Sequence, residues 1–168
     1  MDLVLLIFLF LVIFTVALAG LSFAPWVPTW KKDIERAMDL VKLTPEQTFY
    51  DLGCGDGRVV FRFVKKYKCK GVGVEMAVPV YAIARIRSFF YKKTKIVLGN
   101  LFTTDLSDAD VVFLFGMPDK LNEKLAEKFR KELKPGTQVI SYVFPLIGLE
   151  PVKKEKPEKR SALYLYRF

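Results

Sequence analysis

The chain of 168 residues contains no histidine, only two cysteines and almost no charge in its first thirty residues. Without histidine there is no imidazole base, no Ser-His-Asp or Cys-His arrangement and no imidazole metal ligand. Cys54 and Cys69 lack zinc-site spacing and have no second pair. We therefore expect no metal centre and no disulfide framework, and a reducing compartment is the default.

Charge divides the chain into two unlike parts. Residues 1–30 carry one charged side chain, Asp2, whereas residues 31–168 carry all 27 lysines and arginines and 17 acidic residues, a net charge of 27 − 17 = +10. The mean hydropathy of +0.23 is an average over these two parts. The second part alone has the composition and length of one soluble domain, which excludes a polytopic membrane protein, a multidomain enzyme and a disordered chain.

An uncharged run of 22 residues extends from Leu3 to Ala24. As a helix it would be about 33 Å long, enough to cross the hydrocarbon core, and Trp26 and Trp30 follow at the depth of an interfacial aromatic belt. A cleaved signal peptide is the alternative, since Ala17-Leu18-Ala19 fits a small-x-small site. However, no basic segment precedes the run, and the run continues past that site. We expect residues 1–30 to form a transmembrane anchor and its linker.

The cations after the apolar run predict its orientation. Lys31, Lys32 and Arg36 follow the run, and no lysine or arginine precedes it. The positive-inside bias predicts a single-pass membrane protein whose domain, residues 31–168, lies on the cytoplasmic side. The net positive charge of residues 31–168 has three interpretations. In order of preference they are a surface that faces anionic lipid, a nucleic-acid patch between Arg85 and Lys95, and attraction to acidic proteins.

Helix and strand patterns alternate after residue 30. We expect helices over 31–42, 58–67, 79–91 and 119–133, and strands over 48–52, 71–75, 96–98, 110–115 and 138–144. This alternation predicts a parallel sheet covered by helices. The end of the chain breaks it, because strand candidates around 149–153 and 162–168 flank the polar turn 154–160 with no helix between them. We therefore expect an antiparallel hairpin at the sheet edge.

The most informative segment, residues 51–57, follows a predicted strand and opens a helix, with the sequence Asp51-Leu52-Gly53-Cys54-Gly55-Asp56-Gly57. Its glycines let the backbone turn tightly and approach a ligand. Glu75 ends the next strand, where an acid can accept both hydroxyls of a ribose. A dinucleotide fingerprint would place its third glycine at position 58, which is Arg58.

The acid before the first glycine separates two cofactors. Asp51 would repel the pyrophosphate of a dinucleotide, which needs free helix-terminal amides. S-adenosylmethionine (AdoMet) has no phosphate and carries an ammonium, which a carboxylate beside the loop suits. The residues therefore favour AdoMet. Asp51 could instead only fix the loop, by accepting hydrogen bonds from its amides. Asp56 could cap the next helix, and Cys54 is a small spacer rather than a nucleophile.

Residues 51–57 resemble motif I of the seven-stranded (class I) AdoMet-dependent methyltransferases, and Glu75 matches their acid after the second strand. The resemblance implies an α/β, Rossmann-like, mostly parallel sheet with an antiparallel C-terminal hairpin, here preceded by one transmembrane helix. Asn100 could instead be a turn residue, and Met76 part of the core. The expected cofactor-binding residues are Thr29, Asp51, Gly53, Cys54, Gly55, Asp56, Gly57, Glu75, Met76, Asn100 and Leu101.

A narrower resemblance rests on four segments: Val27-Pro28-Thr29 before a helix, YDLGCGDGRVV at 50–60, VFLFGMP at 112–118 and VISYVFPL at 139–146. They look like a small family of membrane-anchored protein lysine methyltransferases that modify the c-subunit of ATP synthase or the adenine nucleotide translocase, with archaeal relatives. This resemblance implies a lysine side chain of a protein, including a membrane protein, as the substrate.

Methyl transfer from a sulfonium needs a neutral amine about 3 Å from the methyl group, and no metal. The topology predicts the substrate amine beyond the first and fourth strands, and we take Phe115, Pro118 and Asp119 as the catalytic candidates. Asp119 also fits a helix N-cap, and Phe115 a core position. The segment 116–119 (GMPD) departs from the Asn/Asp-Pro-Pro-aromatic motif of methyltransferases for adenine or glutamine, which argues against a nucleic-acid partner.

Three functions fit these residues. The first is a membrane-anchored protein lysine methyltransferase, which suits a domain with almost no insertions to form a lid. The second is a methyltransferase for a membrane lipid or lipophilic small molecule, which the anchor permits equally well. The third is a non-catalytic AdoMet-fold scaffold, against which the complete set of Asp51, Gly53, Gly55 and Glu75 argues.

Overall fold

A computed structural model describes residues 3–22, 27–116 and 123–168. Five helices are described: α1 (Leu3–Ser22), α2 (Lys31–Asp39), α3 (Arg58–Tyr67), α4 (Val78–Ser88) and α5 (Glu123–Glu132). The strands are β1 (Thr48–Leu52), β2 (Lys70–Glu75), β3 (Thr94–Leu98), β4 (Val111–Leu114), β5 (Gln138–Tyr142), β6 (Lys153–Glu155) and β7 (Leu163–Arg167).

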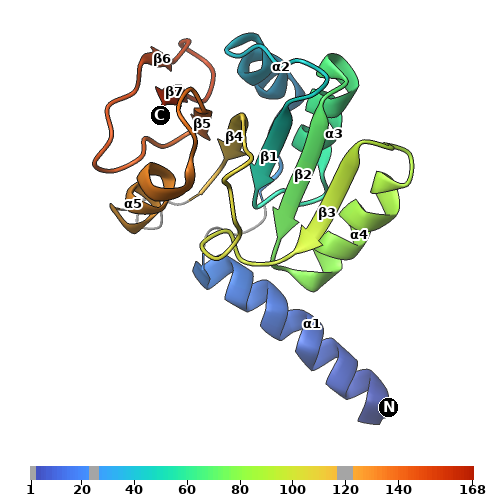
Figure 1. The fold of residues 1–168 in the computed structure, drawn as a ribbon. Coiled ribbons are helices and arrows are strands. Elements are labelled where there is room, and N and C mark those ends of the chain that lie inside the picture. Colours follow the sequence, from blue (N-terminus) through green and yellow to red (C-terminus); the bar gives the residue numbers. More distant parts are fainter. Residues whose placement is uncertain (1–2, 23–26, 117–122) are drawn as a thin grey trace.

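The strands form one seven-stranded sheet in the order β3-β2-β1-β4-β5-β7-β6 (Figure 1). The first five strands along the chain pair in parallel, and β7 is antiparallel to both β5 and β6. The mostly parallel sheet with a C-terminal hairpin is therefore confirmed. Because β1 lies between β2 and β4, the chain reverses its direction across the sheet beside the carboxyl end of β1, where ligands bind in open α/β sheets.

Helices cover both faces of the sheet, so the central strands are buried on both sides (Figure 1). Phe49 of β1 lies in one core with residues of α2, α3 and α4, and its ring stacks on Phe63 at 3.9 Å. The neighbouring β1 residues Tyr50 and Leu52 belong to a second core with Phe129 of α5. Successive side chains of a β-strand point to opposite faces of the sheet. The side chains of each predicted apolar strand are therefore divided between the two cores.

Some element boundaries differ from the prediction. The strand expected over 138–144 ends at Tyr142, because Val143 has a φ of 74°, which takes the backbone out of the extended conformation. The strand expected around 149–153 lies further along the chain. The strand β6 begins at Lys153 and runs to Glu155, into the predicted turn, and it pairs with Leu163–Leu165. The helix expected over 119–133 is described from Glu123 onward.

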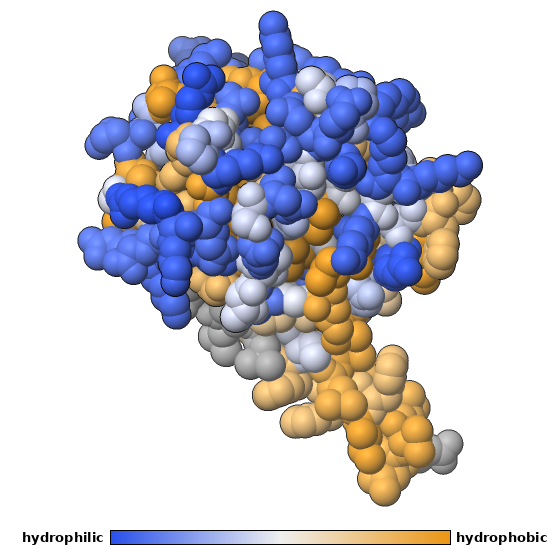
Figure 2. Space-filling model, viewed as in Figure 1, coloured by the Kyte–Doolittle hydropathy of each residue, from blue (hydrophilic) through white to orange (hydrophobic). Residues whose placement is uncertain are grey.

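The helix α1 covers most of the uncharged run, and its large apolar side chains from Leu3 to Val16 are exposed, apart from the half-buried Val12. Figure 2 shows it as an apolar rod that extends from a largely hydrophilic domain. In residues 3–22, 27–116 and 123–168, no helix is long and apolar enough to cross a membrane. The transmembrane anchor predicted from Leu3–Ala24 is therefore not confirmed.

Candidate active site

The glycine-rich loop joins the carboxyl end of β1 to the first turn of α3. The backbone N–H groups of Gly53 and Cys54 both donate to the Val74 carbonyl at 2.9 Å, which fixes the loop to the end of β2. Gly57 has a φ of 79°, and a Cβ at this position would overlap the ring of Phe61. Glycine is therefore required where the loop enters the helix.

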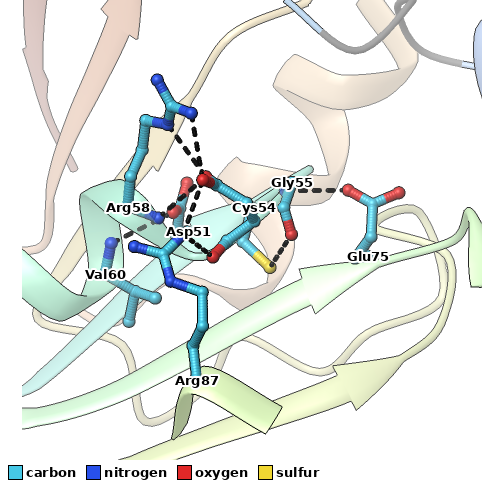
Figure 3. Close-up of polar contacts among 8 residues, drawn as sticks. Asp51, Cys54, Gly55, Arg58, Val60, Glu75 and Arg87 are labelled. Atoms are coloured by element: carbon cyan, nitrogen blue, oxygen red, sulfur yellow. Dashed lines mark hydrogen bonds and ion pairs between the residues drawn. The ribbon is translucent and has the colours of Figure 1, made fainter. Parts of the chain in front are cut away.

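Glu75 connects this loop to the end of β2. Its Oε2 accepts a hydrogen bond from the Gly55 N–H at 2.9 Å (Figure 3). Its Oε1 accepts from the N–H groups of Met76 at 2.9 Å and Ala77 at 2.8 Å. The Glu75 side chain is only 9% exposed, so these donors hold one carboxylate against the loop at the place where a ribose acceptor is expected.

Asp51 lies beneath the loop and is almost fully buried. Its Oδ2 accepts a hydrogen bond from the Val60 N–H at 3.2 Å. Burial raises the pKa of Asp51 to about 8 against the lowering effect of the Val60 N–H, and the nearby charges of Glu75 and Asp56 raise it further. A cation beside this carboxyl group would favour its ionised form, which fits the ammonium of AdoMet.

Asp56 is held by two arginines from different helices, α3 and α4. It pairs with Arg58 Nε at 2.9 Å and with Arg87 Nη1 at 2.5 Å, and Arg87 also donates to the Asp56 carbonyl at 2.7 Å. Burial opposes ionisation, but these arginines lower the pKa of Asp56 below its usual value. The Asp56 side chain thus fastens the loop to α4. Arg87 is 31 residues away in sequence, and no motif there signals the contact.

Cys54 behaves as the spacer that the sequence predicts. Its side chain is buried, and burial together with the charges of Asp51 and Glu75 raises the pKa of its thiol well above the usual value. On the other side of the sulfur lies Gly73 of β2, where an added Cβ would lie 2.8 Å from the Cys54 Sγ. The small thiol and the absent side chain at Gly73 together let the loop pack closely on β2.

The segment after β3 lies at the same edge of the sheet. Leu98 is the register partner of Glu75, and Gly99 N–H donates to the Glu75 carbonyl at 3.0 Å. Asn100 Oδ1 accepts from the Phe102 N–H at 2.9 Å, so the Asn100 side chain organises its own turn. The next residue, Leu101, is buried, and Met76 after β2 is half-buried.

Phe115 follows β4 beside the glycine loop, because Leu114 is the register partner of Leu52. Its ring meets that of Tyr142 edge-on at 5.0 Å. The Tyr142 hydroxyl donates to the buried Asp33 carboxylate of α2 at 2.8 Å, and burial and Asp33 together raise the pKa of Tyr142 to about 12. The strained backbone of Val143 follows directly.

The structure therefore brings most of the predicted cofactor residues to one edge of the sheet. Thr29 is buried two positions before the start of α2, and no contact joins it to the loop among the described hydrogen bonds. The catalytic candidates Pro118 and Asp119 lie outside the described residues. The sequence did not predict the Asp33–Tyr142 contact, whose residues are 109 positions apart, or the left-handed backbone of Val143.

Residues 51–153 match a family described as the ANTKMT methyltransferase domain. The chain belongs to this family. It is 38% identical over 149 residues to a protein-lysine N-methyltransferase of Saccharolobus islandicus, covering 84% of this chain and 92% of that protein. It is 29% identical over 153 residues to an ATP synthase C-subunit lysine N-methyltransferase of Caenorhabditis elegans, covering 85% and 80%. The expected family resemblance is confirmed.

A solved structure agrees with the methyltransferase fold. An RNA methyltransferase from Salinibacter ruber, in complex with S-adenosyl-L-homocysteine, superposes with a TM-score of 0.79 and 30% identity over 84% of this chain and 93% of that one. The protein is thus an AdoMet-dependent methyltransferase with the class I fold.

Proposed function

We propose that the protein is a protein-lysine N-methyltransferase that uses AdoMet as its methyl donor. The observation that carries the proposal is its similarity to the Saccharolobus islandicus protein-lysine N-methyltransferase over 92% of that protein's length. The Caenorhabditis elegans relative, named for lysine methylation of the ATP synthase C-subunit, supports the same substrate class.

The residues at the carboxyl edge of the sheet fit AdoMet. Glu75 would accept the ribose hydroxyls, and Met76 and Asn100 would border the adenine, as the class I resemblance implies. Asp51 would balance the ammonium, because a cation favours ionisation of a buried carboxyl group whose pKa is raised to about 8. Asp56, in its ion pairs with Arg58 and Arg87, would fix the loop rather than contact the cofactor.

AdoMet supplies an electrophilic methyl group, and the chain has to present a neutral amine to it in line. The apolar surroundings at Phe115 disfavour an ammonium and so promote loss of the lysine proton. The ring of Phe115 is positioned by Tyr142, which is itself held by Asp33. Pro118 and Asp119 remain predictions for the same site.

The proposal includes a membrane location. Residues 3–24 would hold the protein at a membrane as a single-pass anchor, with the catalytic domain, residues 31–168, on the cytoplasmic side. Support comes from the absence of charge in this run, the exposure of the α1 side chains and the cations Lys31, Lys32 and Arg36 that follow. A tethered enzyme favours substrates in the same membrane by effective concentration.

Transfer of a labelled methyl group tests the proposal. The full chain is incubated with methyl-labelled AdoMet and a membrane fraction, and the products are separated into protein, lipid and RNA. Label in protein that survives lipid extraction and maps to lysine is the expected result, and a Glu75→Gln variant should lose it. Label confined to lipid favours the alternative function, a lipid methyltransferase. The exposed apolar helix α1 also supports that alternative. Label in RNA contradicts both, and no label together with no AdoMet binding by calorimetry favours a scaffold.

A further inference from the structure

The surface of α4 and the turn after it is apolar where a soluble domain is normally polar. Ile83 is 49% exposed and Ile86 is 63% exposed, while Phe89 and Phe90 are 73% and 84% exposed. Together these two phenylalanines leave roughly 300 Å² of their surface in contact with solvent. Single exposed apolar residues are normal, but a contiguous group of large ones marks an interaction site.

Helical geometry brings these side chains together into what we call the α4 surface, defined by Ile83, Ile86, Phe89 and Phe90. The N–H groups of Phe89 and Phe90 bond back to the carbonyls of Ile86 at 3.3 Å and Arg87 at 3.2 Å, so the helical turn continues past Ser88. Residues three or four positions apart then lie on one side of the helix. On the right flank of Figure 2, where Figure 1 places α4, apolar residues lie next to hydrophilic ones.

The segment of the chain that carries the α4 surface has charge of one sign. Residues 76–104 contain no acidic residue and five cations, namely Arg85, Arg87, Lys92, Lys93 and Lys95. Lys92 and Lys95 are exposed. The guanidinium carbon of Arg85 lies 5.3 Å from the centre of the Phe89 ring, so charge and aromatic surface are directly adjacent.

We propose that the α4 surface docks on an anionic lipid surface, with Phe89, Phe90, Ile86 and Ile83 entering the headgroup region and Arg85, Lys92 and Lys95 lying against lipid phosphates. Exposed aromatic residues with flanking cations suit the interface of an anionic membrane, where each lysine or arginine near the surface adds about fivefold in affinity. A second copy of the chain suits the surface less, because a symmetric contact would oppose like charges.

Two neighbouring elements support a lipid occupant. The helix α1, whose apolar side chains are exposed, contacts α4, so the apolar surfaces of the two helices lie on adjacent elements. Arg87 of α4 is bonded to Asp56 of the cofactor loop, so the α4 surface is held in a fixed position relative to the catalytic site. Docking through α4 would therefore orient the enzyme on the bilayer, a task that a single anchoring segment does not fulfil.

Because α1 alone would bring the protein to vesicles, the test reports on α4 itself. The full chain carries a Phe90→Cys substitution labelled with the fluorophore nitrobenzoxadiazole. The native Cys54 and Cys69 are buried, so the label goes to the new exposed thiol. The matched control is Val152→Cys, a 63% exposed position just before β6. The vesicles are phosphatidylcholine with or without phosphatidylglycerol.

We expect a blue shift and brighter emission at position 90 on vesicles with phosphatidylglycerol, quenching by lipids brominated near the headgroup, and no change at position 152. A Lys92→Glu/Lys95→Glu variant should reduce this response more than tenfold. Vesicle flotation without a response at position 90 would overturn the docking proposal and leave the anchor and the methyl transfer intact. An equal response on neutral vesicles would also overturn it, as would a response to RNA or to a second copy detected by light scattering without lipid.

Discussion

Replacing Asp51 by asparagine should change how the stability of the protein depends on pH. Burial and the charges of Glu75 and Asp56 raise the pKa of Asp51 to about 8 in the folded protein, whereas an unfolded chain would titrate near 4. Between these two values the folded state holds a proton that the unfolded state has released. The stability contributed by protonated Asp51 is therefore complete below pH ~4 and is lost as the pH rises to about 8.

The size of the effect follows from this difference. Each pH unit inside the window changes the free energy of unfolding by up to ~1.4 kcal/mol, so between about pH 5 and pH 7 the wild type should lose about 3 kcal/mol that the Asp51→Asn variant does not lose. Asparagine can still accept the hydrogen bond from the Val60 N–H, which limits other changes. Urea unfolding of both proteins at a series of pH values measures the difference. Parallel pH profiles would refute the raised pKa.

Three further predictions concern the same region. Glu75→Gln should weaken binding of AdoMet ~100-fold by calorimetry, because it removes a charged acceptor for the ribose, and an unchanged affinity would remove Glu75 from the site. Gly73→Ala should destabilise the fold by about 1–3 kcal/mol in urea unfolding, since its Cβ would lie 2.8 Å from the Cys54 Sγ. Adding Cys54→Ala should recover part of that loss, and no recovery would contradict the packing argument. Tyr142→Phe should cost about 1–3 kcal/mol in the same assay by leaving the buried Asp33 without its hydroxyl donor, and a neutral effect argues against that contact.

The sequence was sufficient for the fold and for the core of the cofactor site because both depend on local patterns. The glycines at 53, 55 and 57 all have positive φ values, and the alternation of apolar segments predicted the buried parallel strands. Glu75 followed from its position at the end of the second strand, and its carboxylate does bond to the loop at Gly55.

Contacts between distant residues could not be predicted in the same way. Arg87 contacts Asp56 across 31 positions, and Tyr142 contacts Asp33 across 109, because the sheet topology brings together segments that share no motif. The left-handed backbone at Val143 contradicts the preference of a β-branched residue, so local propensity predicted a longer strand there. The hairpin itself was predicted. Its register, in which Lys153–Glu155 pairs with Leu163–Leu165, depends on the pairing of the two strands and not on the charge pattern of the turn between them.

The proposed function rests on transfer of a methyl group from AdoMet to a lysine side chain. The most direct measurement supplies AdoMet with a trideuterated methyl group to the full chain and a membrane fraction, and then locates the mass increment in peptides by mass spectrometry. We predict trideuteromethyl groups on lysine with the wild type and their loss with Glu75→Gln. Increments on another residue type, or only on lipid or RNA, would contradict the proposed function.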